Sequence, residues 1–257
     1  MPHQEMYLDG QRVPGVSDLL GVMDRTWLQP WFAKEELARC INELAKPRPD
    51  IDAERFEKTL LASWRKRIKE KDYAAPAVGQ LARDIGTEFH NWVEAYLKGN
   101  AHIIRPDLSL KVLPLTGEFV RYHAEWNLNP TIGQELNVVS KRYVYQGTFD
   151  FLGTNNKHPG LCLADWKTSS KIDDTYGLQV ALYAYAYGEQ MGWAEAETWE
   201  KITHGLTVRL DKYTHRLEWQ VYKDLPYLFR VAIGLREAYD YRNKVGAWEL
   251  ESINELN

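Results

Sequence analysis

Residues 147–168 read GTFDFLGTNNKHPGLCLADWKT, two largely apolar runs joined by a polar turn. The runs are rich in β-branched and aromatic residues, which favours strands, and the segment TNNKHPG between them is typical of a turn. Asp150 interrupts the first run, and the second run closes on Asp165 and Lys167. Side chains two residues apart in a strand point to the same face. We therefore expect Asp165 and Lys167 to stand side by side at the end of a buried strand.

The segments downstream and just upstream extend this pattern. A strand-like run at 137–146 precedes the two runs, so the sequence predicts an antiparallel β-meander beginning at residue 137. A helix is expected at 175–191, two further strands at 201–211 and 214–223, and a last amphipathic helix at 226–244.

The N-terminal part has a different character. YLDGQRVP at 7–14 predicts a short hairpin with Asp-Gly at its turn, and most of residues 31–99 has a helical pattern. AKPRPD at 45–50 interrupts the helical region, and Gly, Asn and Pro within 98–109 end it. Another helix is expected at 114–128. The chain is thus mostly helical before it becomes rich in strands.

Composition limits the class of protein. With 257 residues, 44% hydrophobic and 26% charged, the chain is expected to be a soluble globular protein. Cys40 and Cys162 cannot supply the four thiolates of an iron–sulfur cluster, and a reducing compartment fits two cysteines. A GxxxxGK[ST] phosphate loop is absent, so no ATP site is expected. No signal peptide or span of about 20 apolar residues occurs, which predicts an intracellular protein without a membrane segment.

The net charge of −4 hides a basic run at 46–71. Within this run, Arg65, Lys66 and Arg67 are consecutive and are candidates for binding nucleic-acid phosphates. A solvated helix face is the competing explanation. Trp64, Trp92 and Tyr73 could add a stacking platform for bases, although packing in a core explains most tryptophans.

Four polar groupings lie at the edges of the expected elements. In chain order they are His90 with Glu94, Asp150, Asp165 with Lys167, and Gln179 with Tyr183. Residues four apart share one face of a helix, which applies to the first and last groupings. Taken singly, each has an ordinary explanation as a satisfied histidine, a turn residue, an ion pair or helix packing.

Together, the motifs GTEFH, GTFD, ADWKTS and QVALY resemble those of PD-(D/E)XK nucleases. The resemblance covers about residues 80–190 and is to the RecB-like branch, which includes viral, bacterial and mitochondrial genome-maintenance exonucleases. The opening YLDGQRVPGVSDLLG is similar to that of phage-type members. One departure is Phe149 before Asp150, where the family name specifies proline.

The resemblance implies an α/β fold with a restriction-endonuclease-like core, in which helices flank a central mixed β-sheet. We expect a single nuclease domain over 1–257, comprising an N-terminal hairpin and helical extension at 1–75 and a core at 76–257.

Phosphodiester hydrolysis needs a positioned water and divalent cations that neutralise phosphate charge. Oxygen ligands suit Mg²⁺ or Mn²⁺, and we expect two ions. The predicted ligands are His90, Asp150, Asp165 and, by the resemblance, the backbone carbonyl of Trp166. Lys167 would orient or deprotonate the water, with Asp150 and Asp165 completing the catalytic set. The predicted supporting residues are Glu94, Gln179 and Tyr183. Glu135 is interpreted as a surface residue and left out of the site.

The function expected from these residues is that of a metal-dependent DNA exonuclease in recombination, repair, replication or degradation. A structure- or site-specific endonuclease of the same fold, a non-catalytic nucleic-acid-binding protein and a structural protein with simple ion pairs remain alternatives. The expected partners are DNA with single strands or free ends, and replication or recombination proteins. The expected location is the cytoplasm of a bacterial or phage-infected cell, and the oligomeric state stays open.

Overall fold

The computed structural model describes residues 6–8, 11–23, 74–100 and 110–243, together with helical residues at 38, 39, 42, 58, 62 and 66. The chain divides into two compact units, Met1–Met23 with Gly86–Asn257, and Asp24–Ile85. The division at residue 75 between an extension and a nuclease core stays a prediction.

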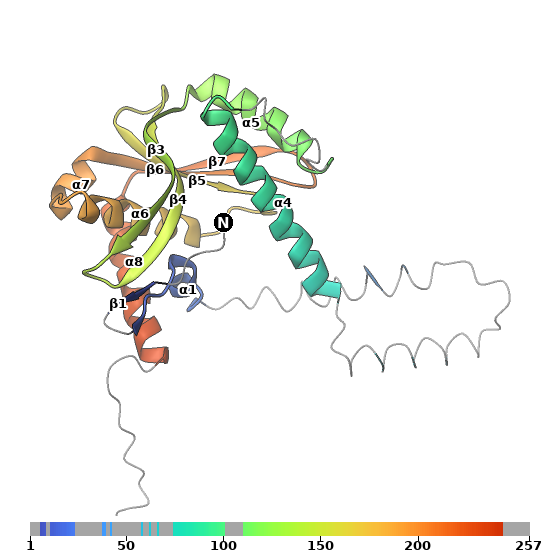
Figure 1. The fold of residues 1–257 in the computed structure, drawn as a ribbon, viewed down its shortest axis with the longest axis horizontal. Helices are drawn as coiled ribbons and strands as arrows, with labels where there is room; N and C mark the ends of the chain where they lie inside the picture. The colour runs from blue at the N-terminus through green and yellow to red at the C-terminus, as the bar shows by residue number, and fades with distance from the viewer. Residues whose placement is uncertain are drawn as a thin grey trace, which may run out of the picture. The chain divides into compact units, whose positions relative to one another are not determined.

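A five-stranded mixed sheet forms the centre of the larger unit, as predicted (Figure 1). Its strands, in spatial order, are β3 (Asn129–Ser140), β4 (Tyr145–Thr154), β5 (Leu161–Lys167), β6 (Ile202–Leu210) and β7 (Leu217–Tyr222). Neighbouring strands are antiparallel except β5 and β6, which run parallel. The predicted β-meander is present as β3–β4–β5, and β5 lies in the middle of the sheet. The prediction of its first strand at 137–146 is wrong: β3 begins at Asn129, and the predicted run contains a turn at 141–144, whose Lys141 and Arg142 amides donate hydrogen bonds to the Glu189 carboxylate.

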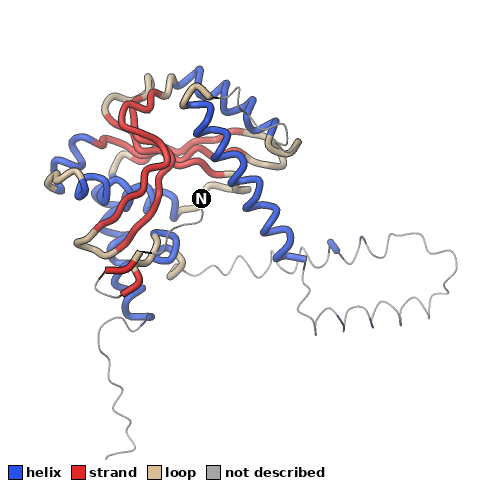
Figure 2. Tube along the Cα trace, in the orientation of Figure 1, coloured by secondary structure: helices blue, strands red, loops and turns tan. Residues whose placement is uncertain are grey.

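Helices cover both faces of the sheet (Figure 2). The helices are α4 (Ala74–Leu97), α5 (Leu113–Trp126), α6 (Thr175–Gln190), α7 (Glu195–Lys201) and α8 (Leu225–Asn243). The side chain of Trp166 contacts α5, whereas Leu163, on the opposite face of β5, belongs to the core around α6. Among the described helices, none combines the length and apolarity that crossing a membrane requires. The fold is α/β, with helices flanking a mixed sheet.

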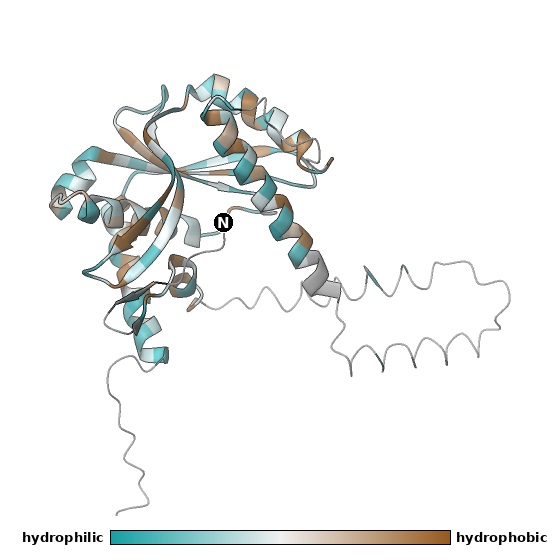
Figure 3. Cartoon of the chain, in the orientation of Figure 1, coloured by the Kyte–Doolittle hydropathy of each residue, from teal (hydrophilic) through white to brown (hydrophobic). Residues whose placement is uncertain are grey.

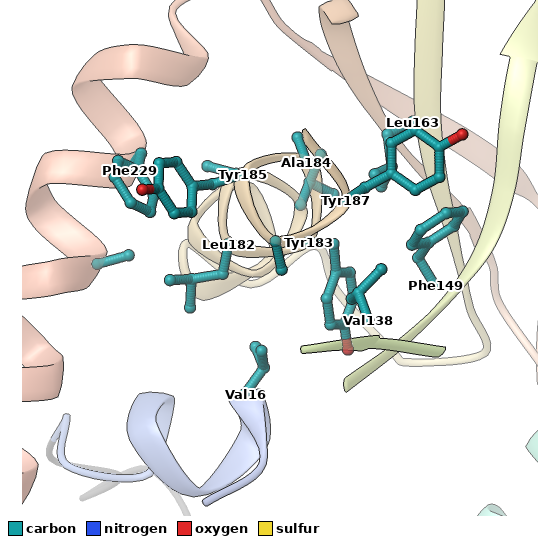
Figure 4. Packing of buried hydrophobic residues seen from close by; sticks show 14 of the residues in the cluster. Val16, Val138, Phe149, Leu163, Leu182, Tyr183, Ala184, Tyr185, Tyr187 and Phe229 are labelled. Atoms are coloured by element: carbon teal, nitrogen blue, oxygen red, sulfur yellow. The ribbon is translucent and has the colours of Figure 1, made fainter. Parts of the chain in front are cut away.

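Helix α6 is the centre of the main core (Figure 4). It lies in the connection from β5 to its parallel neighbour β6, and residues 177–188 are all buried. Tyr185 stacks on Phe229 of α8 with ring centroids 4.2 Å apart. A Cβ at Gly205 of β6 would lie 2.3 Å from a methyl of Val180. Helix α6 therefore packs too closely on β6 to admit a larger residue there.

A second group of aromatic side chains fills the opposite face of the sheet. Trp92 is only 6% exposed, stacks on Tyr96 with centroids 5.1 Å apart, and contacts Phe119 of α5 edge-on. The expectation that Trp92 offers a ring to nucleic-acid bases is therefore wrong, because α5 covers its helix face. Trp64 and Tyr73 lie outside the described residues. Figure 3 shows apolar and polar residues alternating along α4 and α5.

The N-terminal segment packs on this core. The predicted hairpin is present as β1 (Tyr7–Leu8) and β2 (Gln11–Arg12), followed by α1 (Val16–Leu20). Apolar residues of α1 join the cluster around α6, and the amide of Gln146 donates a 3.0 Å hydrogen bond to the carbonyl of Pro14. The hairpin and α1 thus help to hold the start of β4.

Candidate metal and catalytic site

The candidate site lies where strands β4 and β5 separate. Their last paired residues are Phe151 and Ala164, so Asp150 and Asp165 would be the next pair in this register. Instead, the carboxylate of Asp150 accepts a hydrogen bond from the amide of Trp166 at 2.5 Å. Asp150 lies within β4 rather than at its end, because the strand continues to Thr154 and pairs with β5 only from Phe151 onward. The separation gives the two carboxylates room to face a ligand.

Helix α4 brings His90 to this point. The Nδ1 of His90 lies 3.0 Å from Oδ1 of Asp150, although the two residues are 60 positions apart in the chain. Phe89, the preceding residue, is fully buried and contacts Phe119 edge-on, which packs α4 against α5. A Cβ at Gly86 would approach the Thr168 hydroxyl to 3.1 Å. The glycine of the GTEFH motif therefore lets α4 lie close to the segment that follows β5.

Glu135 of β3 completes a group of three potential metal ligands. One ligand atom from each of His90, Glu135 and Asp150 lies within 4.8 Å of the others. The interpretation of Glu135 as a surface residue outside the site is therefore corrected: its Oε1 lies 4.0 Å from Nδ1 of His90, and its side chain is 31% exposed. The pairs Leu136–Phe149 and Gln134–Phe151 place Glu135 across from Asp150. This cross-strand register is the signal that could have identified Glu135.

The carboxylates of this group repel one another in a partly buried place. Burial and the charge of Asp150 raise the pKa of Glu135 to about 8. Burial alone would lower the pKa of His90, but the Asp150 carboxylate overcomes this effect and raises it to about 9. Burial likewise opposes the charge on Asp150, yet the contact with His90 holds its pKa below the ordinary value. Without a cation, His90 therefore holds a proton and Glu135 is largely protonated near pH 7, and a bound cation would release both protons.

Asp165 and Lys167 stand side by side on β5, as predicted from their spacing. Oδ2 of Asp165 lies 2.6 Å from Nζ of Lys167, and these side chains are 5% and 20% exposed. Burial and the nearby Asp150 raise the pKa of Asp165 despite this ion pair. The Lys167 ammonium also lies 5.1 Å from the ring centroid of Tyr176. The amine is therefore held in place but remains partly accessible.

Helix α6 carries the fourth grouping behind these charges. The side-chain amide of Gln179 donates a 2.7 Å hydrogen bond to the hydroxyl of Tyr183, and both residues are buried. A Cβ at Gly147 would lie 2.4 Å from the Tyr183 ring, so the glycine of the GTFD motif makes space for that ring. The supporting role of both residues toward a substrate stays a prediction.

The remaining predicted site residues are Glu94, Trp166 and the basic residues 65–67. Glu94 forms an ion pair with Lys98, which directly follows the end of α4. For Trp166, the structure shows a bond from its amide, and the ligand role of its carbonyl stays a prediction. Lys66 is exposed and helical, whereas Arg65 and Arg67 lie outside the described residues. The proposed basic patch stays untested.

The chemistry of the donor set suits a divalent cation. Carboxylate oxygens are the ligands that Mg²⁺ and Mn²⁺ prefer, and an imidazole nitrogen beside them is compatible with Mn²⁺. Partly buried carboxylates held within a few ångströms of one another gain stability when a cation neutralises them. His90, Glu135 and Asp150 therefore fit a metal ion, with Asp165 and Lys167 on the neighbouring strand.

Comparisons with known proteins give little further information. No family model matches the sequence, and no curated protein matches it. One similar solved structure is that of a protein from Eubacterium rectale that carries a provisional name as an exonuclease. It is 11% identical, with a TM-score of 0.39 over 68% of this chain and 79% of that chain. A second, of the protein SSO0001, is 14% identical, with a TM-score of 0.31 over 61% and 74% of the two chains. Because these TM-scores are low, the function has to be inferred from the site itself.

Proposed function

We propose that the protein is a metal-dependent nuclease that hydrolyses phosphodiester bonds in DNA and acts from strand ends. The observation that carries the proposal is the Asp165–Lys167 ion pair at the end of β5, beside the ligand group of His90, Glu135 and Asp150. A cation site next to a fixed amine meets both needs of phosphodiester hydrolysis, charge neutralisation and a positioned nucleophile.

Each side chain has a role in this proposal. His90, Glu135, Asp150 and Asp165 would hold Mg²⁺ or Mn²⁺. When bound, such an ion neutralises phosphate charge and lowers the pKa of water. Lys167, held by Asp165 and partly exposed, would donate hydrogen bonds to the attacking water or to a phosphate oxygen as negative charge develops.

The finer assignment, to the RecB-like branch of the PD-(D/E)XK nucleases, is part of the proposal. It is supported by the order of the four motifs along the chain and by their positions on α4, β4, β5 and α6. The presence of the acidic motifs on two neighbouring strands supports it further. Action from strand ends, with recombination, repair, replication or degradation as the context, rests on the resemblance alone.

The test is degradation of end-labelled linear DNA, single- and double-stranded, beside a closed circle, with Mg²⁺, Mn²⁺ or EDTA. Wild type is compared with Lys167→Ala and with Lys157→Ala. Lys157 also forms an ion pair, at 3.2 Å to Glu125, but it lies in the β4–β5 turn at the other end of the sheet. It therefore serves as the matched control.

We expect metal-dependent loss of linear DNA, survival of the circle, and a fall of about a hundredfold or more in Lys167→Ala only. Cutting of the circle would mean that the protein is an endonuclease and not an exonuclease. If folded wild type cuts no DNA with either metal, or if Lys167→Ala keeps full activity, the proposal is wrong.

A further inference from the structure

The turn between β6 and β7 has a defined conformation. Residues 211–216 read DKYTHR, and the amide of Asp211 closes the turn with a 2.9 Å hydrogen bond to the carbonyl of Arg216. The Asp211 carboxylate accepts hydrogen bonds from the amides of Tyr213 at 2.8 Å and Thr214 at 2.9 Å. The backbone of this basic turn, as we call residues 211–216, is therefore fixed by its own first residue.

The basic turn lies at the same end of the sheet as the candidate site. β5 and β6 are parallel, and Lys167 pairs in register with Arg209. Asp211 follows two residues later, about 7 Å further along the strand direction. Arg209 also donates a 2.8 Å hydrogen bond to the carbonyl of Ser169, just beyond Lys167. The turn is thus connected to the segment that follows the ion pair.

The cations of the turn are available to a ligand. Lys212 is half-buried and Arg216 is exposed, and neither forms an ion pair with any residue that the structure describes. The carboxylates nearby are already paired: Asp211 and Glu218 with Arg209, and Glu118 with Arg121. Arg209 is shared between two carboxylates, so these paired groups together carry one negative charge, and Lys212 and Arg216 leave the surface with one positive charge in excess.

An aromatic ring and a hollow accompany these cations. Tyr213 is 69% exposed, and the ammonium of Lys212 lies 5.6 Å from its ring centroid. A cavity of about 370 Å³ lies between the turn and α5, lined by Glu118, Arg121 and residues 214–218. An exposed ring between cations beside a polar hollow is the combination that single-stranded nucleic acid requires, because bases stack on rings and phosphates bind cations.

We propose that the basic turn binds the DNA strand next to the phosphate that is cut. Lys212 and Arg216 contact backbone phosphates, and Tyr213 stacks on an unpaired base. This inference rests on the proposed nuclease function and deepens it, because it identifies single-stranded DNA, or a single-stranded end, as the preferred substrate.

Two variants test the proposal against matched controls. The double variant Lys212→Glu with Arg216→Glu removes the cations, and Tyr213→Ala removes the ring. Helix α8 offers an equivalent pair for control, because Tyr227 is 53% exposed and the Arg230 guanidinium lies 5.9 Å from its ring. Tyr227→Ala and Arg230→Glu therefore change the same kinds of residue elsewhere. All altered side chains are at least partly exposed, and thermal unfolding verifies that each variant folds.

Binding is measured by fluorescence anisotropy of labelled single- and double-stranded DNA in EDTA, over a series of salt concentrations. We expect the double charge variant to bind single strands about tenfold more weakly, with a salt slope lower by about 1.4 for two lost phosphate contacts. Tyr213→Ala should lower the affinity for single-stranded DNA about fivefold and the affinity for duplex DNA much less. The control variants should match wild type.

Three results would overturn the inference. Wild-type affinity and salt slope in the double variant would show that the turn does not contact DNA, and equal losses in the controls would show a general charge effect. Loss of affinity for duplex only would contradict the single-strand preference. Cleavage assays on the same samples with Mg²⁺ separate the two proposals. If wild type cuts DNA and the turn variants cut it equally well, only the proposal for the basic turn is wrong. If wild type neither binds nor cuts DNA, both proposals are wrong.

Discussion

Two clusters of charged side chains lie in adjoining parts of the sheet and differ in how their charges are satisfied. In the paired cluster, Arg209, Asp211 and Glu218, the guanidinium contacts both carboxylates and the carbonyl of Ser169. The pKa of Asp211 is lowered, because hydrogen bonds from two backbone amides and the contact with Arg209 outweigh its burial. Its charges have their partners within the protein.

The donor cluster consists of His90, Glu135, Asp150, Asp165 and Lys167. Burial and neighbouring negative charge raise the pKa of both Glu135 and Asp165. The protein thus keeps carboxylates there that its own cations do not fully stabilise. The comparison teaches that a buried ion pair alone does not identify a site, whereas buried carboxyl groups whose pKa stays raised beside an amine do.

The largest expected effect separates function from stability at the donor cluster. Asp165→Asn should reduce nuclease activity about a thousandfold while leaving the free energy of unfolding within about 0.5 kcal/mol of wild type. The amide has the same shape and removes a charge that the fold does not favour. DNA cleavage assays and urea unfolding of the same samples measure both quantities. A large loss of stability would mean that Asp165 is a structural partner like Asp211.

The paired cluster should show the opposite behaviour. Arg209→Met leaves Asp211 without its cation, and we expect the free energy of unfolding to fall by about 3 kcal/mol. Mn²⁺ affinity, measured by titration calorimetry on the folded variant, should stay at the wild-type value. A loss of metal binding with unchanged stability would contradict the distinction between the two clusters.

A buried histidine outside both clusters makes stability sensitive to acid. His204 is 3% exposed, and burial, with the nearby His158 and Lys223, lowers its pKa to about 4 from the ordinary 6.5. Below pH 6.5 the unfolded chain binds a proton that the folded protein does not take up until about pH 4. Stability is therefore lost as the pH falls through this range, by about 2 kcal/mol at pH 5.

Urea unfolding at pH 7 and pH 5 tests this prediction on wild type and His204→Gln. The acid-induced loss should be smaller in the variant, and a change at the half-exposed His215 should not reduce it. If His204→Gln loses as much stability between pH 7 and pH 5 as wild type does, His204 is not the cause, and the acid sensitivity comes from the charge clusters instead.

The smallest expected effect concerns the residue that the sequence did not identify. Glu135→Gln should weaken Mn²⁺ binding about tenfold, because one of three neighbouring ligand side chains loses its charge. Glu218→Gln is the matched control in the paired cluster and should leave metal binding unchanged. Calorimetric titration of both variants compares them directly, and equal affinities would place Glu135 outside the metal site.

The sequence predicts much of the fold because its main elements have clear periods and boundaries. Strands β4 and β5, helix α6 and the last two strands follow from alternation, turn residues and a long helical pattern, and Asp165 next to Lys167 follows from the two-residue period of a strand. The bounds of β3 do not, because the predicted run 137–146 crosses the turn between β3 and β4. These features depend on local geometry, which residues near one another in the chain determine.

What the sequence does not show depends on contacts between distant segments. Glu135 reaches Asp150 through the β3–β4 register, and its own φ of +49° departs from the extended backbone around it. Trp92 is buried because α5 covers it, which its helical period alone does not reveal. The basic turn acquires its position from the parallel pairing of β5 with β6. Each case requires the tertiary arrangement.

The parallel pairing of β5 with β6 also determines when during synthesis the site can form. A chain made from its N-terminus exposes Asp165 and Lys167 before β6, which begins at Ile202, has been made. Until β6 pairs, one edge of β5 lacks its hydrogen-bonding partner, and α6 has no β6 to pack on. Contacts so distant in sequence form late in folding. Nascent chains should therefore lack the finished surroundings of the donor cluster until β6 has been made and has paired with β5.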